Sequence, residues 1–236
     1  MDLQTAIRQL EALGSADHRA ALARQGVKGE TIGVSAANLA ALRKRIKIDH
    51  DLARGLWLTR RHEARVLATM VADPQAMTEA DLDEWVKAVD HAALAEAIAR
   101  LAANAPSARR VLEKWIMRPE EFTIAAGWNV LARLAADVEV PEGYFGPFLQ
   151  RIENQIHKAA PRGRHAMNAA LIAIGSRGGV LAAKALAAAK RIGAVQVDHG
   201  EWGGKTPDAA TAIARVVDVE SAKPPIAGAK AGRGAG

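Results

Sequence analysis

The sequence of 236 residues contains no cysteine. A disulfide framework and thiol catalysis are therefore excluded, and this absence is typical of cytoplasmic proteins. Aromatic residues make up only 4% of the chain, whereas apolar residues make up 50%. The core must therefore be built from alanine, leucine, valine and isoleucine, a composition that favours helices.

Long apolar runs and alternating strand patterns are also missing. No segment approaches the roughly eighteen apolar residues of a membrane span, and Lys184 interrupts the alanine-rich segment 180–189. Asp2, Arg8 and Glu11 give the first residues an amphipathic pattern that is not typical of a secretory signal, so we expect a cytoplasmic protein with no membrane partner. The short β-branched segment 195–197 is interpreted as a loop.

Metal and cofactor motifs are absent as well. His62-Glu63 lacks the second histidine of a zinc-binding helix, and His157 and His165 have no carboxylates clustered near them in the sequence. No glycine-rich run matches a nucleotide-binding loop. We therefore predict neither a metal ion nor an organic cofactor.

Apolar residues at helical spacing are the dominant pattern in the sequence. Four amphipathic helices are predicted at about 78–88, 90–103, 106–117 and 119–135, with Pro106 and Pro119 in the first turns of the last two. Upstream, two helices within 2–25 are separated at Gly14, with Ser15 as N-cap; Ser35 caps a third, and two more follow at about 52–58 and 61–71. Short connections between helices predict antiparallel neighbours.

The net charge of +6 is unevenly distributed. The last fifteen residues carry Lys223, Lys230 and Arg233 and no acid. We predict that segment 222–236, rich in glycine, alanine and proline, is a disordered tail, and that residues 1–221 form a single domain.

Charge also changes sign along the predicted domain. Acidic residues dominate between Asp73 and Glu96, and basic residues recur at 40- to 50-residue intervals elsewhere, as at Arg65, Arg110, Arg151 and Arg191. Helix-pair repeats of the HEAT type are about 40 to 47 residues long. The recurrence therefore predicts a solenoid with one basic concave face, although solvated helix faces also explain single lysines and arginines.

Three passages of the sequence resemble the DNA alkylation repair family, bacterial glycosylases built from HEAT-like helix pairs. The first contains Gly26-Val27-Lys28, Ile32-Gly33-Val34, 39–43, Leu56-Trp57, His62-Glu63-Ala64-Arg65 and Ala72-Asp73-Pro74. The second contains 82–90, Glu113-Lys114-Trp115 and Glu121-Phe122, and the third Val197-Asp198-His199-Gly200 and Lys205-Thr206-Pro207-Asp208-Ala209. The resemblance implies an all-α, HEAT-like solenoid that binds double-stranded DNA.

The resemblance also implies a reaction centre. In the family, a carboxylate stabilises the charge that develops on the deoxyribose as an N3- or N7-alkylated purine leaves, while two tryptophans and an arginine hold the lesion's backbone. By position, the tryptophan-aspartate run falls on Ala92 and Ala93, the catalytic carboxylate on Glu96, the arginine on Ala125 and the second tryptophan on Ala169. Gaps in the mapping leave Asp90 as a second carboxylate, Trp128 or Trp85 as a lesion-facing aromatic, and Arg133 within reach of Ala125.

Purely structural roles also explain several of these residues. Glu96 is explained equally by an exposed pair with Arg100 four residues later, and Trp85, Trp115 and Trp128 by core filling. Segment 200–208 is a candidate phosphate contact, with Gly204 where the family commonly has a cysteine, but Thr206 as N-cap and Pro207 at the first helical position explain it as a helix start.

Three functions remain open from the sequence. The first is a DNA-binding protein with lost or reduced base excision, in contact with DNA through Arg43, Lys47, Arg61, Arg65, Arg110, Lys114, Arg118, Arg151, Arg162, Arg164 and Lys205. The second is an active alkylpurine glycosylase that uses Glu96 or Asp90. The third is a scaffold for a protein partner, bound through the acidic helix at 79–84.

Overall fold

The computed structural model describes residues 1–198 and 205–221, with side chains as far as residue 219. Within these ranges the chain forms thirteen α-helices and two short 3-10 helices and contains no strand. The predicted all-α class is therefore confirmed. The predicted tail at 222–236 lies outside the described residues.

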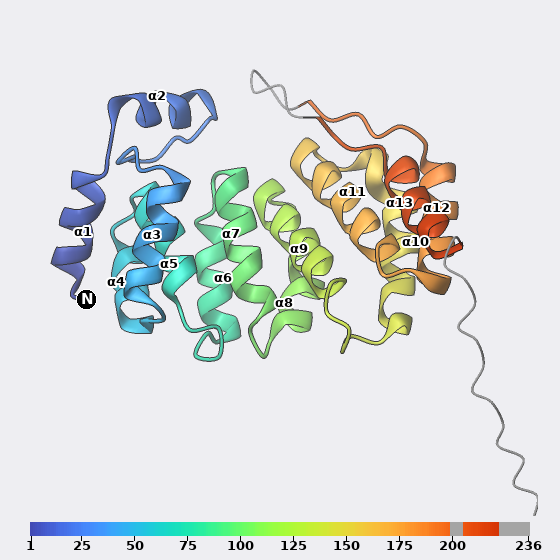
Figure 1. Cartoon of the computed structure of the whole chain (residues 1–236), viewed down its shortest axis with the longest axis horizontal. Coiled ribbons are helices and arrows are strands. Elements are labelled where there is room, and N and C mark those ends of the chain that lie inside the picture. Colours follow the sequence, from blue (N-terminus) through green and yellow to red (C-terminus); the bar gives the residue numbers. More distant parts are fainter. Residues whose placement is uncertain (199–204, 222–236) are drawn as a thin grey trace, which may run out of the picture.

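The first three helices form an N-terminal segment. They are α1 (Leu3–Ala12), α2 (Ala16–Arg24) and α3 (Ala36–Ile46). Ser15 and Ser35 cap α2 and α3 as predicted, each accepting from the backbone N–H three residues later at 3.2 Å. No side chain of α2 is buried, and this helix lies apart from the others at the top of Figure 1.

The rest of the described chain consists of helix pairs stacked side by side (Figure 1). The first helices of the pairs, which we call the even row, are α4 (His50–Leu58), α6 (Glu79–Lys87), α8 (Ala108–Trp115), α10 (Gly146–Gln155) and α12 (Gly179–Ile192). Their partners, the odd row, are α5 (His62–Val71), α7 (Ala92–Ala103), α9 (Glu121–Leu134), α11 (Pro161–Gly175) and α13 (Ala209–Ser221). Neighbours within the odd row contact one another throughout. The 3-10 helices Glu142–Phe145 and Ile156–Lys158 flank α10.

Small residues bring these helices close together. A Cβ on Gly127 of α9 would lie 2.9 Å from the backbone N of Ile116, just after α8. No side chain fits there, because the obstacle is backbone. Glycine inside a helix costs roughly 0.5–1 kcal/mol relative to alanine, so close packing offsets a local penalty.

A buried carboxylate anchors the loop between α2 and α3 to the helix pairs. Glu63 of α5 is 1% exposed and accepts from the backbone N–H groups of Ile32, Gly33 and Val34 at 2.8, 2.5 and 3.1 Å. These bonds compensate the burial of a charge, which is otherwise strongly unfavourable. Glu63 therefore holds the loop between α2 and α3 against α5.

Helix starts differ from the predictions at three prolines. Pro106 and Pro119 precede the helices α8 and α9 and do not lie within their first turns. The cap of α13 is Asp208, whose carboxylate accepts from the N–H of Thr211 at 2.7 Å, so Pro207 precedes the cap and Thr206 is not the N-cap. Residues 200–204 of the candidate phosphate contact lie outside the described residues.

Candidate nucleic-acid interface

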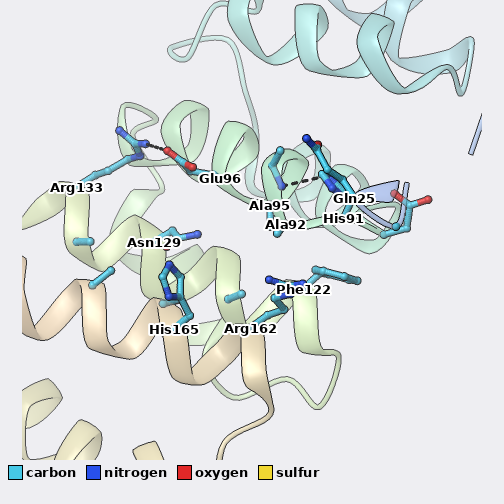
Figure 2. Close-up of a pocket in the computed structure, with 17 residues that line it drawn as sticks. Gln25, His91, Ala92, Ala95, Glu96, Phe122, Asn129, Arg133, Arg162 and His165 are labelled. Atoms are coloured by element: carbon cyan, nitrogen blue, oxygen red, sulfur yellow. Dashed lines mark hydrogen bonds and ion pairs between the residues drawn. The ribbon is translucent and has the colours of Figure 1, made fainter. Parts of the chain in front are cut away.

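A cavity of about 800 Å³ opens on the odd row between α7, α9 and α11 (Figure 2). Gln25 and Gly26, at the end of α2, form part of its rim. Segments far apart in the sequence therefore meet around one hollow. Its lining also includes Asp90, His91 and Ala95.

Helical periodicity explains which side chains of α9 and α11 line this cavity. On α9 they are Phe122, Ala125, Asn129, Ala132 and Arg133, and on α11 they are Arg162, His165, Ala166 and Ala169. Each set follows spacings of three, four and seven residues, which place side chains on one face of a helix. The two facing walls therefore combine four alanines with four polar or charged side chains and one phenylalanine.

The structure brings the positions of the implied reaction centre together. Ala92, Ala93, Glu96, Ala125 and Ala169 come from three helices, and all line the cavity. Asp90, the second candidate carboxylate, lies at the same cavity just before α7. The positions that the family resemblance implies therefore surround one cavity. Most of their side chains are single methyl groups.

The Glu96 carboxylate is engaged in ion pairs. Its Oε1 lies 3.2 Å from Arg133 of α9 and 3.5 Å from Arg100, one turn along α7. The predicted pair with Arg100 is thus present, and Arg133 adds a second cation from the facing helix. The Glu96 side chain is 57% exposed, so solvent weakens each pair.

Arg133 is held in a partly desolvated position. Burial lowers the pKa of its guanidinium, the positive charge of Arg100 lowers it further, and Glu96 raises it. An arginine remains charged under these conditions, because its pKa lies far above neutral pH. Arg133 therefore presents a cation to the cavity wall, with its charge partly balanced by Glu96.

His91 closes the cavity beside α7 as a neutral ring. Its Nδ1 accepts from the N–H of Ala93 at 3.2 Å and so caps the helix. Burial, with a smaller effect of His62 at 5.3 Å between ring centroids, lowers the pKa of His91 to about 4. The ring therefore carries no charge near neutral pH and works as a structural cap.

Neither candidate lesion-facing tryptophan faces the cavity. Trp85 is 5% exposed and stacks on Trp57 with ring centroids 4.3 Å apart, and Trp128 is 0% exposed and meets Phe148 edge-on at 6.3 Å. Both fill the core, as the alternative interpretation held. The aromatic ring in the cavity is that of Phe122, which the sequence analysis did not select.

The four recurrent arginines do not share one face, and this prediction is wrong. Arg65 is on α5 of the odd row, whereas Arg110, Arg151 and Arg191 are on α8, α10 and α12 of the even row. Arg65 lies over Trp57 and donates to the carbonyl of Ala88 at 3.3 Å. The recurrence reflects contacts between neighbouring repeats, since Arg110 pairs with Glu79, Arg151 donates to the carbonyl of Ile116, and Arg191 pairs with Glu153.

Three further predicted DNA contacts also tie helices and loops together. Arg61 pairs with Glu11 and Glu30, each at 2.7 Å, and Lys114 pairs with Asp83 and Glu79. Arg164 donates to the carbonyls of His157, Ala159 and Gln196.

Of the predicted bases, only Arg162 lines the cavity. Arg43, Lys47 and Lys205 are exposed outside it, and Arg118 is half-buried outside it. A charge pattern does not reveal whether a guanidinium faces solvent or a carbonyl. The bases outside the cavity therefore stay predicted DNA contacts. Arg133, which the sequence analysis placed within reach of Ala125, lines the cavity, whereas Asn129 was not selected from the sequence.

The described residues contain neither a candidate membrane span nor a candidate metal site. No described helix has both the length and the apolar character needed to cross a bilayer. Within 1–198 and 205–221, no group of three or more histidine, aspartate or glutamate side chains has the geometry of a metal site.

Comparisons with known proteins agree with this geometry. The sequence model of a family described as DNA alkylation repair enzyme matches residues 6–195. The uncharacterized proteins Lin0241 of Listeria innocua and Lmo0209 of Listeria monocytogenes are each 25% identical over 173 residues, which is 72% of this chain and 75% of theirs.

A solved structure is similar over almost the whole chain. It is described as a new family of proteins related to the HEAT-like repeat DNA glycosylases with affinity for branched DNA structures. The TM-score is 0.84 at 27% identity, and the match covers 93% of this chain and 95% of that one. The predicted HEAT-like solenoid is thereby confirmed.

Proposed function

The chain belongs to the DNA alkylation repair enzyme family, and on that premise we propose that it binds branched DNA at the cavity on its odd row without excising alkylated bases. The branched partner is suggested by the described affinity of the structural neighbour. The observation that carries the proposal is the cavity itself. It keeps cations on both walls but has alanine at positions 92, 125 and 169.

Positive charge supports the binding half of the proposal. Arg133 of α9 and Arg162 of α11 line the cavity. Arg100 of α7 pairs with Glu96, which also lines it. Arginine side chains that neutralise phosphates release counterions, which makes binding strong and salt-dependent. The carboxylates of Asp90 and Glu96 oppose this effect, so arginine contacts on both walls are needed.

The ion pairs of Glu96 support the proposed lack of base excision. A carboxylate promotes departure of a cationic purine by stabilising charge on the sugar in the transition state. Glu96 already faces two guanidiniums, which compensate its charge before any substrate arrives. The alanines also provide no ring or guanidinium to hold the backbone at the lesion.

A binding assay with two matched arginine variants tests the proposal. Labelled four-way junction and linear duplex of equal length are titrated with protein between about 50 and 200 mM salt. Arg162→Gln is expected to weaken junction binding roughly fivefold and to lower the salt slope by about 0.9, one phosphate contact. Arg110→Gln removes the same charge from the even row. It is expected to change neither the junction affinity nor the salt slope, because Arg110 pairs with Glu79. Equal effects of the two variants would contradict the proposed face.

The enzymatic alternative is tested with the same protein. Methylated duplex and methylated junction are incubated with it and assayed for released 7-methylguanine, for which we expect no rate above background. Release that is lost in Glu96→Gln or Asp90→Asn would establish the active glycosylase with one of these carboxylates.

The scaffold alternative is weakened by internal pairing of the acidic helix. Glu79 and Asp83 of α6 pair with Arg110 and Lys114 of α8, and Asp81 bonds the capping Thr78. Two of the four acidic residues at 79–84 are therefore already paired with cations, and Glu84 is exposed. Retention of one defined protein by the wild-type chain, lost in Glu84→Gln, would favour the scaffold.

A further inference from the structure

The cavity provides more space than a backbone contact requires. Ala92, Ala125, Ala132 and Ala169 line a volume of about 800 Å³, within the roughly 300–1,000 Å³ typical of sites that bind small ligands. A phosphate backbone rests on a surface and needs no hollow. The space between α7, α9 and α11 therefore suits a group that enters the protein.

The lining combines an apolar ring with base-reading polar groups. Phe122 is half-buried and lines the cavity at the start of α9, and Asn129 lies two turns further along that helix. The Asn129 side chain lines the cavity, and an amide offers both a donor and an acceptor. An aromatic face for stacking and an amide for a base edge are features of sites that bind unpaired bases.

Two arginine side chains lie at opposite ends of the cavity lining. Arg133 lies toward one end and Arg162 toward the other, with Asn129 and His165 between them (Figure 2). The backbone N–H of Arg162 donates to Glu121 Oε1 at 2.9 Å, and the Arg162 side chain lines the cavity. A nucleotide has a phosphate on each side of its sugar, so two separated arginines match its backbone.

We propose that the cavity takes one unpaired nucleotide from the branch point of a DNA junction, with its base on Phe122 and its flanking phosphates toward Arg133 and Arg162. This rests on the proposed function and specifies what the site binds. Extruding a base from a paired duplex costs a few kcal/mol, whereas a base that is already unpaired at a branch avoids most of that cost. The cavity thus provides a physical basis for preferring branched over linear DNA.

Two junctions that differ in one base test the proposal. One carries a single unpaired thymidine at the branch, and the other carries an abasic analogue at the same place. The wild-type protein is expected to prefer the thymidine junction about five- to tenfold, the lower range of base–aromatic stacking. Phe122→Leu keeps an apolar side chain and is expected to remove this preference. Tyr144→Leu, which changes a half-buried ring outside the cavity, is expected to keep it.

A filling variant and a fluorescent base provide independent readouts. Ala169→Leu adds bulk to the cavity wall and is expected to abolish the preference for the thymidine junction over the abasic junction. 2-Aminopurine at the unpaired position is expected to be quenched by the wild-type protein but not by Phe122→Leu. The same probe placed within a paired arm is expected to respond equally to both proteins.

The outcomes separate this inference from the proposed function. Equal affinity for the thymidine and abasic junctions, with tight and salt-dependent binding of both, overturns the nucleotide site and leaves junction binding intact. Failure to bind any DNA at low salt overturns both. A thymidine preference that survives both Phe122→Leu and Ala169→Leu also overturns the site, because the base is then read elsewhere.

Discussion

The Glu96 carboxylate of α7 lies 3.2 Å from the guanidinium of Arg133 on α9, across the wall of the cavity. The pair joins two neighbouring helices of the odd row where the family resemblance places a catalytic carboxylate. The negative charge that would stabilise a cationic sugar as the base leaves is partly balanced by Arg133. The same pair reduces the positive charge that Arg133 presents to DNA.

Glu96→Gln is expected to tighten DNA binding about two- to fivefold and to steepen its salt dependence. The substitution removes a negative charge from the cavity and leaves Arg133 and Arg100 available to phosphates. Fluorescence anisotropy over a salt series measures both quantities. Glu84→Gln, an exposed change on α6 of the even row, is the control and is expected to have no effect. Weaker binding by Glu96→Gln would mean that the carboxylate itself contacts the ligand.

Two fully buried tryptophans are expected to differ in their contribution to stability. The Trp115 Nε1–H donates to Asp83 at 2.8 Å, whereas Nε1 of Trp128 is buried without a hydrogen-bond partner in the described structure. Trp115→Phe loses that bond and leaves Asp83 with fewer partners, a cost of about 1–3 kcal/mol beyond the lost volume. Trp128→Phe removes an unsatisfied donor and should cost less. Urea unfolding compares the variants, and an equal or larger loss for Trp128→Phe would refute the assignment.

Glu63→Gln is expected to destabilise the protein by about 2 kcal/mol or more. An amide places an NH₂ group against one of the donors at Ile32, Gly33 and Val34, so at least one buried N–H loses its acceptor. Hydrogen exchange at these three amides should accelerate. Unchanged protection there would show that the loop does not depend on the carboxylate.

His91→Asn is expected to reduce the loss of stability in acid. The pKa of His91 is about 4 in the folded chain, because of burial, and about 6.5 in the unfolded chain. The unfolded state therefore takes up a proton that the folded state does not, and stability falls as the pH drops from about 6.5 to about 4. Asparagine caps a helix equally well and does not titrate there.

Unfolding by urea near pH 7.5 and near pH 5 measures this effect. At the lower pH the variant should gain roughly 1–2 kcal/mol relative to the wild type, compared with the difference at the higher pH. His18→Asn on the exposed helix α2 is the control. An identical pH dependence for His91→Asn and the wild type would contradict a neutral, buried His91.

Local sequence signals were sufficient to predict the nine helices between residues 2 and 135. Ser15 and Ser35 precede amphipathic segments, and each satisfies the N–H three residues later as capping requires. Alanine and leucine at helical spacing set the core faces, and the arrangement in stacked pairs followed from short connections and the family resemblance. These features depend on neighbours within a few residues, so the sequence alone carries them.

What the sequence determined by itself was thus the helical class, the order of the first nine helices and the family, and its motifs also led to the alanine positions that line the cavity. Only the tertiary structure decided which charges face that cavity. Arg110 and Arg162 are alike in the sequence, yet Arg110 pairs with Glu79 on the even row and Arg162 lines the hollow on the odd row. The pairing of Glu96 with Arg133 joins residues 37 positions apart. The physical reason is that an arginine's contacts depend on how the helices stack, and stacking is set by the packing of the whole chain rather than by residues near the arginine.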